Sequence, residues 1–393
     1  MKIALVILHA DPARGGAERY TVDLASALAK RGHDVAMLAS SFAEGPSPQP
    51  SPRVHGEGEK SVRRHLLAAT GATRLRRYLT FLDSLDAHLA ENKYDIVHAM
   101  LPVRQCDVYH PHAGIAVETI GSGPALSRLA NRFNRKRQEF ATVERQLIGG
   151  SSRTIVLCLS DYVKQTARRH YPRIDQSRLV KLFNGIDLQR FDPAARPEAG
   201  MQLRGKLGIS QQQIVALMLA QDFERKGLKE AILALARAAD RRLILLVGGR
   251  DDPAPYRRLA ASAGVAEQIY FAGATDDPYA FYRAADFFVL PTRHDPCSLV
   301  VLEALAMGVP VISTIFNGAC EIMPRGEAGM VLDEPADLLA LEMAMRAMLD
   351  PVQRGRLADQ CLALRPALSQ QIHLDKLEQA YQSLAGAKAV KTD

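Results

Sequence analysis

The 393-residue sequence is poor in cysteine and has no long apolar run. Its five cysteines are scattered, odd in number and never spaced as C-x-x-C. Neither a disulfide framework nor a zinc site is therefore expected, and a reducing cytoplasm fits. No apolar stretch approaches about 18 residues, and the opening run Ile3–Leu8 is shorter than the core of a signal peptide. We therefore expect a cytoplasmic protein without a membrane-spanning segment.

Signatures of two common ligand classes are also absent. There is no G-x-G-x-x-G after the first predicted strand, so a dinucleotide fingerprint is missing. Basic residues are not interleaved with aromatics and no nucleic-acid-binding module is visible, so nucleic acid is not an expected partner. The net charge of +7 and the pI of about 9.2 instead suit nucleotides, phosphorylated glycans or an anionic membrane surface.

The length predicts two domains of about 180 to 200 residues each. Short, continuously apolar runs alternate with helix-length amphipathic segments, which is typical of parallel strands buried on both faces and predicts the α/β class. The predicted strands are Ile3–Leu8, Val35–Ala39, Ile96–Ala99, Ile155–Leu159, Ile214–Leu219, Leu243–Val247, Ile269–Ala272, Phe287–Leu290 and Val311–Thr314.

The turn sequence from Asn184 to Asp187 marks the break between the domains. We place an N-terminal domain at residues 1–183, a C-terminal domain at 184–368, and at 369–393 a helix that packs back toward the N-terminal domain. Pro46–Pro52 is expected to form a mobile surface loop. Two doubly wound, Rossmann-like domains facing a central cleft would hold a ligand at the carboxyl ends of their strands.

The most informative segment runs from His294 to Pro310 and reads HDPCSLVVLEALAMGVP. Asp295 begins a turn-and-cap sequence, and Glu303 lies inside the helix that follows, about 10 Å away at about 1.5 Å rise per residue. This separation is too long for a shared proton. It suits one elongated ligand touched at both ends, with a phosphate over the amides of the helix start. The alternative is a buried helix with a solvated acid at each end.

Two further motifs follow the first strand of each predicted domain. GGAER, from Gly15 to Arg19, precedes a helix, where glycines allow a ligand to approach the backbone closely. RKG, from Arg225 to Gly227, places two adjacent cations at a strand end, which suits a diphosphate. A plain loop-to-helix turn and a basic pair on a surface turn are the respective alternatives.

Two histidines, His110 and His112, lie in the turn DVYHPHAG. A histidine can donate to a sugar hydroxyl and can transfer protons near neutral pH. The pair could also bind a metal, but no cluster of carboxylates or cysteines accompanies it. For at least one of the two, a structural role is the default interpretation.

Taken together, these motifs resemble the retaining glycosyltransferases of family 4, which have the GT-B fold. The resemblance covers essentially the whole chain and rests on GGAER, the Tyr-His turn, Asn-Gly-Ile-Asp, Arg-Lys-Gly and the acid-x7-Glu motif with LEALAMGVPVI, in that order. The stretches CDVYHPHAGIAVE, ATVER and DFERKG resemble the branch of bacterial lipopolysaccharide-core glucosyltransferases.

The resemblance implies a role for each motif. Glu303 would bind the ribose hydroxyls of a nucleotide, and Asp295 would bind hydroxyls of the donor sugar. Arg225 and Lys226 would bind the diphosphate. The residues implied as catalytic are His110, Arg225, Lys226 and Asp295. The donor-binding set adds Gly15, Gly16, Ser298, Leu299, Val300 and Glu303, and the weaker candidates are His112, Asn184 and Glu18.

The sequence departs from the family pattern at two positions. Asp295 stands where the family usually has Glu, so its contacts with the sugar are expected to differ. Gln221 stands where the family has an Arg, so that diphosphate binding would lean on Arg225.

The activity implied by the resemblance is transfer of a hexose with retention of configuration, with UDP-glucose as the favoured donor and a glycan or lipid-linked glycan as the acceptor. No metal cofactor is implied, because no Asp-x-Asp motif lies at a strand end and the cations and helix dipole could neutralise the leaving diphosphate. The alternatives are a nucleotide-sugar epimerase or sugar phosphorylase on the same fold, and a non-catalytic module that binds nucleotide sugar or glycan.

Two basic segments of the N-terminal domain bear on the acceptor. They suggest a phosphorylated or lipid-linked glycan, presented at an anionic membrane face that the protein contacts peripherally. Solvated helix faces are the alternative. The residues are Arg63, Arg64, Arg74, Arg76, Arg77, Arg128, Arg132, Arg135, Lys136 and Arg137.

Overall fold

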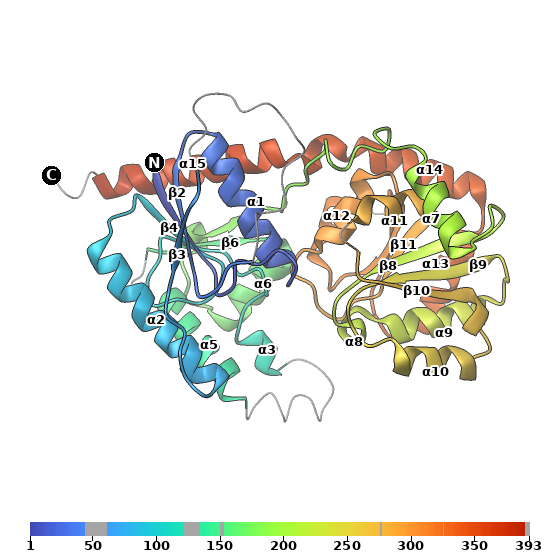
Figure 1. The fold of residues 1–393 in the computed structure, drawn as a ribbon, viewed down its shortest axis with the longest axis horizontal. Helices are drawn as coiled ribbons and strands as arrows, with labels where there is room; N and C mark the ends of the chain where they lie inside the picture. Colours follow the sequence, from blue (N-terminus) through green and yellow to red (C-terminus); the bar gives the residue numbers. More distant parts are fainter. Residues whose placement is uncertain (44–60, 122–133, 150–152, 276, 325, 390–393) are drawn as a thin grey trace. The chain divides into compact units, whose positions relative to one another are not determined.

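The computed structural model describes residues 1–43, 61–121, 134–149, 153–275, 277–324 and 326–389 (Figure 1). It forms two compact units, which are Met1–Leu182 with Leu374–Asp393, and Phe183–His373. The division expected at Asn184 lies beside the first of these boundaries, and the one expected at Ser369 lies a few residues before the second. The predicted loop at Pro46–Pro52 and two of the predicted acceptor-side cations, Arg128 and Arg132, lie outside the described residues.

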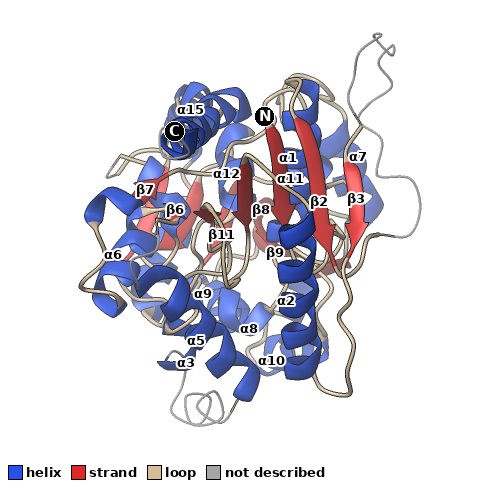
Figure 2. Ribbon diagram, turned by 90° about the vertical axis from the view of Figure 1, so that its left-hand side faces the viewer, coloured by secondary structure: helices blue, strands red, loops and turns tan. Residues whose placement is uncertain are grey.

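The first unit contains a seven-stranded parallel sheet with the order β3-β2-β1-β4-β5-β6-β7. From β1 the chain runs outward to β3 on one side and then from β4 to β7 on the other, which is the doubly wound arrangement. Figure 2 shows β2 and β3 as neighbouring arrows at one edge. The strands are β1 (Lys2–Val6), β2 (Asp34–Ala39), β3 (Arg63–Leu66), β4 (Ile96–Ala99), β5 (Val108–Tyr109), β6 (Ile155–Cys158) and β7 (Leu179–Lys181).

Helices cover both faces of this sheet. They are α1 (Gly16–Lys30), α2 (Arg74–Glu91), α3 (Glu118–Gly121), α5 (Arg135–Gly149), α6 (Asp161–His170), the 3-10 turn η1 (Gln176–Arg178) and α15 (Gln370–Ala389). Leu24 of α1 and Tyr381 of α15 belong to one apolar cluster, so the last helix completes the core on that face. Phe81 of α2 and Val143 of α5 belong to a second cluster on the opposite face.

The second unit contains a six-stranded parallel sheet with the order β10-β9-β8-β11-β12-β13. Its strands are β8 (Ile214–Leu219), β9 (Leu243–Gly248), β10 (Ile269–Gly273), β11 (Phe287–Leu290), β12 (Val311–Thr314) and β13 (Gly329–Leu332). Its helices are α7 (Ala199–Leu207), α8 (Phe223–Lys226), α9 (Leu228–Ala238), α10 (Ala254–Ser262), α11 (Pro278–Ala284), α12 (Leu299–Ala306), α13 (Leu338–Ala347) and α14 (Pro351–Ala363), with 3-10 turns η2 (Ala266–Gln268), η3 (Gly318–Ile322) and η4 (Arg365–Leu368).

The sequence does not predict four of these strands, β3, β5, β7 and β13. Three of them are edge strands, and an edge strand does not need the continuous apolar run that marks a strand buried on both faces. β3 reads RRHL and is largely exposed. β5 is too short, at two residues, to give a pattern.

Three strands of the second sheet position the candidate site. β8, β11 and β12 are neighbours and run parallel, so their carboxyl ends lie at one edge. The segments that follow them are Ala220–Gly227, Pro291–Ser298 and Ile315–Gly318. The Arg-Lys-Gly motif and the first acid of the acid-x7-Glu motif therefore meet at this edge, although they lie far apart in the sequence.

Candidate active site

The Arg-Lys-Gly motif forms a single helical turn, α8, that is pressed against the loop after β11. Asp222 begins the turn, and its carboxylate accepts from the amide of Arg225 at 3.1 Å. Gly227 ends it with a φ of 83°, and a Cβ at this position would lie 2.3 Å from the carbonyl oxygen of Pro291. No other residue fits there without moving the backbone, so the glycine is what allows the two cations to approach the loop.

Lys226 and Asp295 form a buried ion pair between their ammonium and carboxylate groups. The exposed fraction is 9% for Lys226 and 7% for Asp295. Burial lowers the pKa of Lys226, and the neighbouring carboxylate partly offsets this. Burial alone would raise the pKa of Asp295, but the charges of Lys226 and Arg225 hold it below its ordinary value. At neutral pH the carboxylate is therefore ionised, with the lysine as its counter-ion.

Arg225 is the more open of the two cations. Its guanidinium donates to the Asp222 carboxylate at 2.8 Å and to the carbonyl of His294 at 2.6 Å, and its side chain remains 40% exposed. The sequence interpretation treats Lys226 and Asp295 as contacts with different parts of a ligand, whereas the structure joins them directly. Arg225 is the exposed cation beside that pair.

The start of α12 presents backbone amides. Ser298 occupies the N-cap position, but its side chain makes no capping hydrogen bond. Leu299 and Val300 are partly exposed, and in the described part of the chain their amides have no acceptor. Amides at the first positions of a helix lack intrahelical partners and favour an anion. The phosphate contact expected at these amides from the sequence stays a prediction.

Glu303 lies within α12 and is held by a tyrosine that the sequence interpretation missed. The hydroxyl of Tyr282, on α11, donates to Glu303 Oε2 at 2.7 Å and lies 3.1 Å from the carbonyl of Val300. Burial, and then the charge of Glu303, raise the pKa of Tyr282 well above its ordinary value. Tyr282 therefore stays protonated and acts as a fixed donor. In the sequence it appears only as one aromatic in an apolar helix.

Asn317, also missed, fixes the loop that carries Asp295. Its side-chain oxygen accepts from the amides of Ser298 at 3.3 Å and Ala319 at 3.1 Å, and its amide group donates to Ser313 Oγ at 3.1 Å. A short parallel bridge pairs Asp295 with Asn317. A polar residue three positions after the end of the strand Val311–Thr314 was the available signal.

Asn184, a weaker candidate, is placed beside the same loop. It is 3% exposed, and among the described residues its side-chain oxygen has no hydrogen-bond partner. Burial raises the pKa of the Cys297 thiol, and a hydrogen bond with the backbone of Asn184 opposes that shift. The Asn-Gly-Ile-Asp turn therefore lies against the Asp295–Ser298 turn.

The glycines of the first unit precede α1. Gly15 is extended, with a φ of 176°, and makes no side-chain cap. A Cβ at this position would meet only the flexible end of Glu18, at 2.8 Å. Packing within the described residues therefore gives no strict need for glycine here. The pKa of Glu18 is raised by burial.

His110 lies in a cluster of rings in the first unit. Its ring centroid is 5.4 Å from that of Tyr20, 5.3 Å from His98 and 4.2 Å from His112. His98 in turn bonds to the hydroxyl of Tyr381 at 2.5 Å. His110 has no exposed surface, whereas His112 is partly exposed. Of the two histidines, the structure therefore gives His112 the surface that a ligand could touch.

The turn that carries both histidines is anchored by Glu144 of α5. This fully buried carboxylate accepts from the hydroxyls of Tyr109 at 2.7 Å and Tyr171 at 2.9 Å, and from the amide of Ala116 at 2.8 Å. Burial raises its pKa, and the hydrogen bonds oppose the shift. Glu144 therefore holds both ends of the His110–His112 segment.

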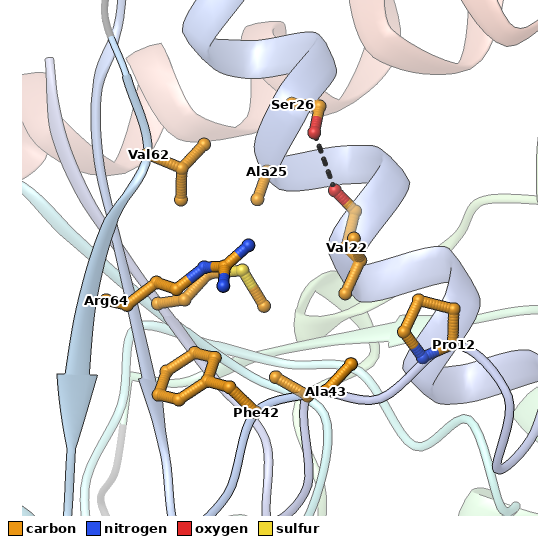
Figure 3. A pocket seen from close by; sticks show the side chains of 10 residues that line it. Pro12, Val22, Ala25, Ser26, Phe42, Ala43, Val62 and Arg64 are labelled. Carbon is orange, nitrogen blue, oxygen red and sulfur yellow. Dashed lines mark hydrogen bonds between the residues drawn. The ribbon is translucent and has the colours of Figure 1, made fainter. Parts of the chain in front are cut away.

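The first unit also contains a small hollow. Figure 3 shows it between α1 and β3, with Arg64 lying near Phe42 and Val62. Its volume is about 40 Å³, room for about one water molecule, whereas ligand pockets measure about 300 to 1,000 Å³. None of the predicted catalytic or donor-binding residues lines it, so it is not a site for a sugar nucleotide.

Among the described residues, no three His, Cys, Asp or Glu side chains are grouped so that they could hold a metal ion. In the same ranges, no helix combines the length and apolarity that crossing a bilayer requires.

Two family models match consecutive parts of the chain. Glycosyltransferase Family 4 matches residues 14–190, and Glycosyl transferases group 1 matches residues 201–360. The lipopolysaccharide glucosyltransferase WaaG of Escherichia coli K12 is 27% identical over 339 residues, which cover 85% of this chain and 86% of that protein.

Solved structures agree with these matches. A crystal structure of WaaG, a glycosyltransferase involved in lipopolysaccharide biosynthesis, superposes with a TM-score of 0.82 at 25% identity and covers 95% of this chain and 98% of its own. The Anabaena protein HepE in complex with UDP-glucose has the same fold, with a TM-score of 0.71 at 18% identity, covering 99% and 100%. The chain therefore belongs to the family 4 glycosyltransferases of GT-B fold, is a hexosyltransferase, and resembles the lipopolysaccharide-core branch.

Proposed function

We propose that this hexosyltransferase moves glucose from UDP-glucose to a glycan or lipid-linked glycan, with retention of configuration and without a metal ion. The name of WaaG, a lipopolysaccharide glucosyltransferase, supports glucose and a glycan acceptor. The HepE complex shows that this fold holds UDP-glucose in another protein.

At one edge of the second sheet lie Arg225, the Lys226–Asp295 pair and the amides at the start of α12. This is the observation on which the proposal rests. Asp295 would bind hydroxyls of the sugar. Arg225, Lys226 and the helix amides would bind the diphosphate, with Arg225 forming the exposed contact. Glu303, held by Tyr282, would bind the ribose hydroxyls.

These residues provide charge stabilisation rather than a nucleophile. As the bond between the anomeric carbon and the phosphate oxygen breaks, negative charge grows on the diphosphate, where the ammonium, guanidinium and helix amides lie in place. The acceptor hydroxyl forms its bond to the anomeric carbon from the same face. Its proton passes to the leaving phosphate oxygen, so no separate base is required.

The ion pair explains why Lys226 needs Asp295. Burial lowers the pKa of Lys226 and so favours the neutral amine, whereas the Asp295 carboxylate opposes that shift. The ion pair also restricts the rotamers of the lysine before the donor arrives. The single carboxylate thus serves both the sugar and the lysine.

We assign the acceptor to the first unit. His112 would contact it directly, and His110 would support His112 through their ring contact at 4.2 Å. The role proposed for Gly15 and Gly16 is contact with a phosphate group, with Glu18 nearby in the same unit. The enzyme would act in the cytoplasm, with the basic face of this unit touching an anionic membrane; co-sedimentation with anionic vesicles that is lost in high salt would support this.

Two other activities are testable against this proposal. An epimerase or phosphorylase on the same fold would react with a sugar nucleotide or sugar phosphate without a glycan acceptor. A binding module would bind the donor but neither transfer nor hydrolyse its sugar. Release of UDP from UDP-glucose, with the fate of the sugar followed by NMR, separates the three and reads the anomeric configuration.

The direct test is a donor screen. UDP-, GDP- and ADP-linked hexoses are compared for thermal stabilisation and for hydrolysis, with and without EDTA. A donor present at 100 times its dissociation constant should add about 2.7 kcal/mol of stability. We expect UDP-glucose to give the largest shift, with no loss in EDTA. Equal shifts for all bases, or activity that EDTA abolishes, would contradict the proposal.

A further inference from the structure

Two helices of the first unit begin with cations where acids are usual. The first turn of α2 carries Arg74, Arg76 and Arg77, and that of α5 carries Arg135 and Lys136, with no acidic residue in either turn. A helix start is the positive end of the dipole, so these cations are placed unfavourably. Departures from such local preferences are expected at functional sites.

The two helix starts lie side by side (Figure 1). The rings of Tyr78 in α2 and Phe140 in α5 stack with centroids 4.1 Å apart, and the ammonium of Lys136 lies 5.0 Å from the Phe140 ring. Arg74 is one helical turn before Tyr78 and shares its face of α2. The stack therefore brings Lys136 beside Arg74.

A third segment adds Arg14. It lies in the loop after β1, at the carboxyl edge of the sheet, and α5 begins at the same edge because it leads back into β6. Burial lowers the pKa of Lys136, and the charges of Arg74, Arg77 and Arg14 lower it further. The pKa of His9 is lowered by burial and then by Arg14, Lys136 and Arg77. The four cations therefore face one another across one small region.

Within the described residues, none of these four cations forms an ion pair. Two arginines of the same unit show the contrast. Arg104 bonds to Asp86 at 2.6 Å and Asp83 at 2.8 Å on α2, and Arg63 bonds to Asp34 at 2.7 Å.

Two carboxylates near Arg14 do not neutralise it. Asp11 and Glu18 are close enough to Arg14 to influence the same groups, but Asp11 accepts from the amide of Ala13 at 3.0 Å, and neither is within ion-pair distance of Arg14. The mutual repulsion of the four cations is thus left in place in the free protein.

We propose that Arg14, Arg74, Arg77 and Lys136 form a binding site for a phosphate group carried by the acceptor. This rests on the proposed function, since it specifies the acceptor as a phosphate-bearing glycan or a phosphate-linked glycolipid. Arginines supply planar forks for phosphate oxygens, and the lysine supplies a point charge. A phosphate would relieve the repulsion among the cations, and the cations oriented by the Tyr78–Phe140 stack would orient the acceptor.

The test measures binding of glucose 6-phosphate and inorganic phosphate to the full chain by titration calorimetry at low salt. UDP is kept at saturation, so that the probe does not report on the second unit. The test variant is Arg74→Gln/Lys136→Gln. Its control is Lys30→Gln/Lys93→Gln, which removes two exposed cations of the same unit, one at the last residue of α1 and one just after the end of α2. We expect the test variant to weaken both probes at least about tenfold and the control to change them less than about twofold.

A second arm identifies the source of the phosphate. Phosphatidylglycerol vesicles replace the soluble probe, and binding of the same variants is compared. Cluster-dependent binding in either arm supports the site, and the arm that responds tells a glycan phosphate from a lipid headgroup. Equal affinities of wild type and test variant in both arms would overturn it.

Two readouts separate this result from folding and from the donor site. The test variant should be at least as stable as wild type, because it removes like charges; a lower Tm would make the cluster structural. If phosphate binding instead falls in Arg225→Gln and not in the test variant, the probe binds in the second unit and the proposal is wrong. The thermal stabilisation of each variant by UDP is measured as well, so that a loss of donor binding is detected separately from a loss of phosphate binding.

Discussion

The two units share one architecture but differ in whether the charged side chains of their candidate sites are paired within the protein. In the second unit the site charges are matched in advance: Lys226 pairs with Asp295 and Tyr282 donates to Glu303. In the first unit Arg74 and Lys136 stand together without counter-ions in the described chain. Internal pairing fixes a geometry before the ligand arrives, whereas unpaired charge leaves the ligand to supply the counter-ion. The first arrangement suits the donor, and the second suits an anionic acceptor.

The largest effect should follow from breaking the pre-formed pair. Asp295→Ala leaves the Lys226 ammonium buried without a counter-ion, and we expect a loss of about 3 to 5 kcal/mol in the free energy of unfolding, together with loss of activity. Urea unfolding measures the first quantity. The double variant Lys226→Met/Asp295→Ala should recover most of the stability but none of the activity. Equal stability of the single and double variants would show that the pair is not coupled.

A smaller but still large loss is expected from Gly227→Ala, which tests the packing that positions the two cations. Its φ of 83° is unfavourable for alanine, and its Cβ would lie 2.3 Å from a backbone oxygen. Gly208→Ala is the matched control, since its φ is 72° and nothing lies within 4 Å. We expect about 1 kcal/mol for the control and at least about 2 kcal/mol more for Gly227→Ala, with weaker UDP binding. Similar losses in the two variants would refute the close approach.

Tyr282→Phe removes the donor to Glu303 without opening a cavity. We expect the KM for UDP-glucose to rise about tenfold while kcat stays within about twofold, because ribose contacts are made equally in the ground and transition states. Tyr279→Phe is the control. It deletes a hydroxyl on the same helix, from a buried residue, which donates to the backbone carbonyl of Asp192 at 2.8 Å. An unchanged KM in Tyr282→Phe would remove Tyr282 from the site.

The smallest expected effect is a different pH dependence of stability in the two units, set by Glu144 in the first and Asp295 in the second. The folded-state pKa of Glu144 is raised and that of Asp295 is lowered. Between its unfolded pKa of about 4.3 and its raised folded value, Glu144 binds more protons when folded, so stability increases as the pH falls through that range. Asp295 loses its contribution only below about pH 4.

The measurement is the change in Tm between about pH 7 and about pH 5, compared between wild type and Glu144→Gln. The gain on acidification should be larger in wild type. A larger gain in the variant would reverse the sign of the assigned shift.

The sequence predicts the buried strands well and the exposed ones poorly. β8, β9, β11 and β12 are fully buried and begin and end close to their predicted limits. β3 escapes prediction because its side chains are mostly exposed and charged. Continuous apolarity is a signal of burial on both faces, so an edge strand such as β3 need not carry it, although the edge strand β10 was predicted.

For the site, local motifs were visible but their partners were not. The Lys226–Asp295 pair joins residues 69 positions apart, and Tyr282 and Glu303 come from two different helices. Lys226, Asp295 and Glu303 could be selected from their motifs, but nothing in the sequence shows that Lys226 pairs with Asp295, or separates Tyr282 from other core aromatics. His110 was favoured over His112 by its place in a motif, and only the packing of rings around it shows which of the two is exposed.

In the proposed function, the charge of Lys226 stabilises the leaving diphosphate of a sugar nucleotide. The most direct measurement is the rate of UDP release by Lys226→Ala at saturating UDP-glucose, compared with wild type and with Lys229→Ala, a nearby lysine on α9 outside the site. We expect a kcat lower by about 10²- to 10³-fold for Lys226→Ala and an unchanged kcat for the control. A kcat within about twofold of wild type for Lys226→Ala, in a folded protein that binds UDP, would contradict it.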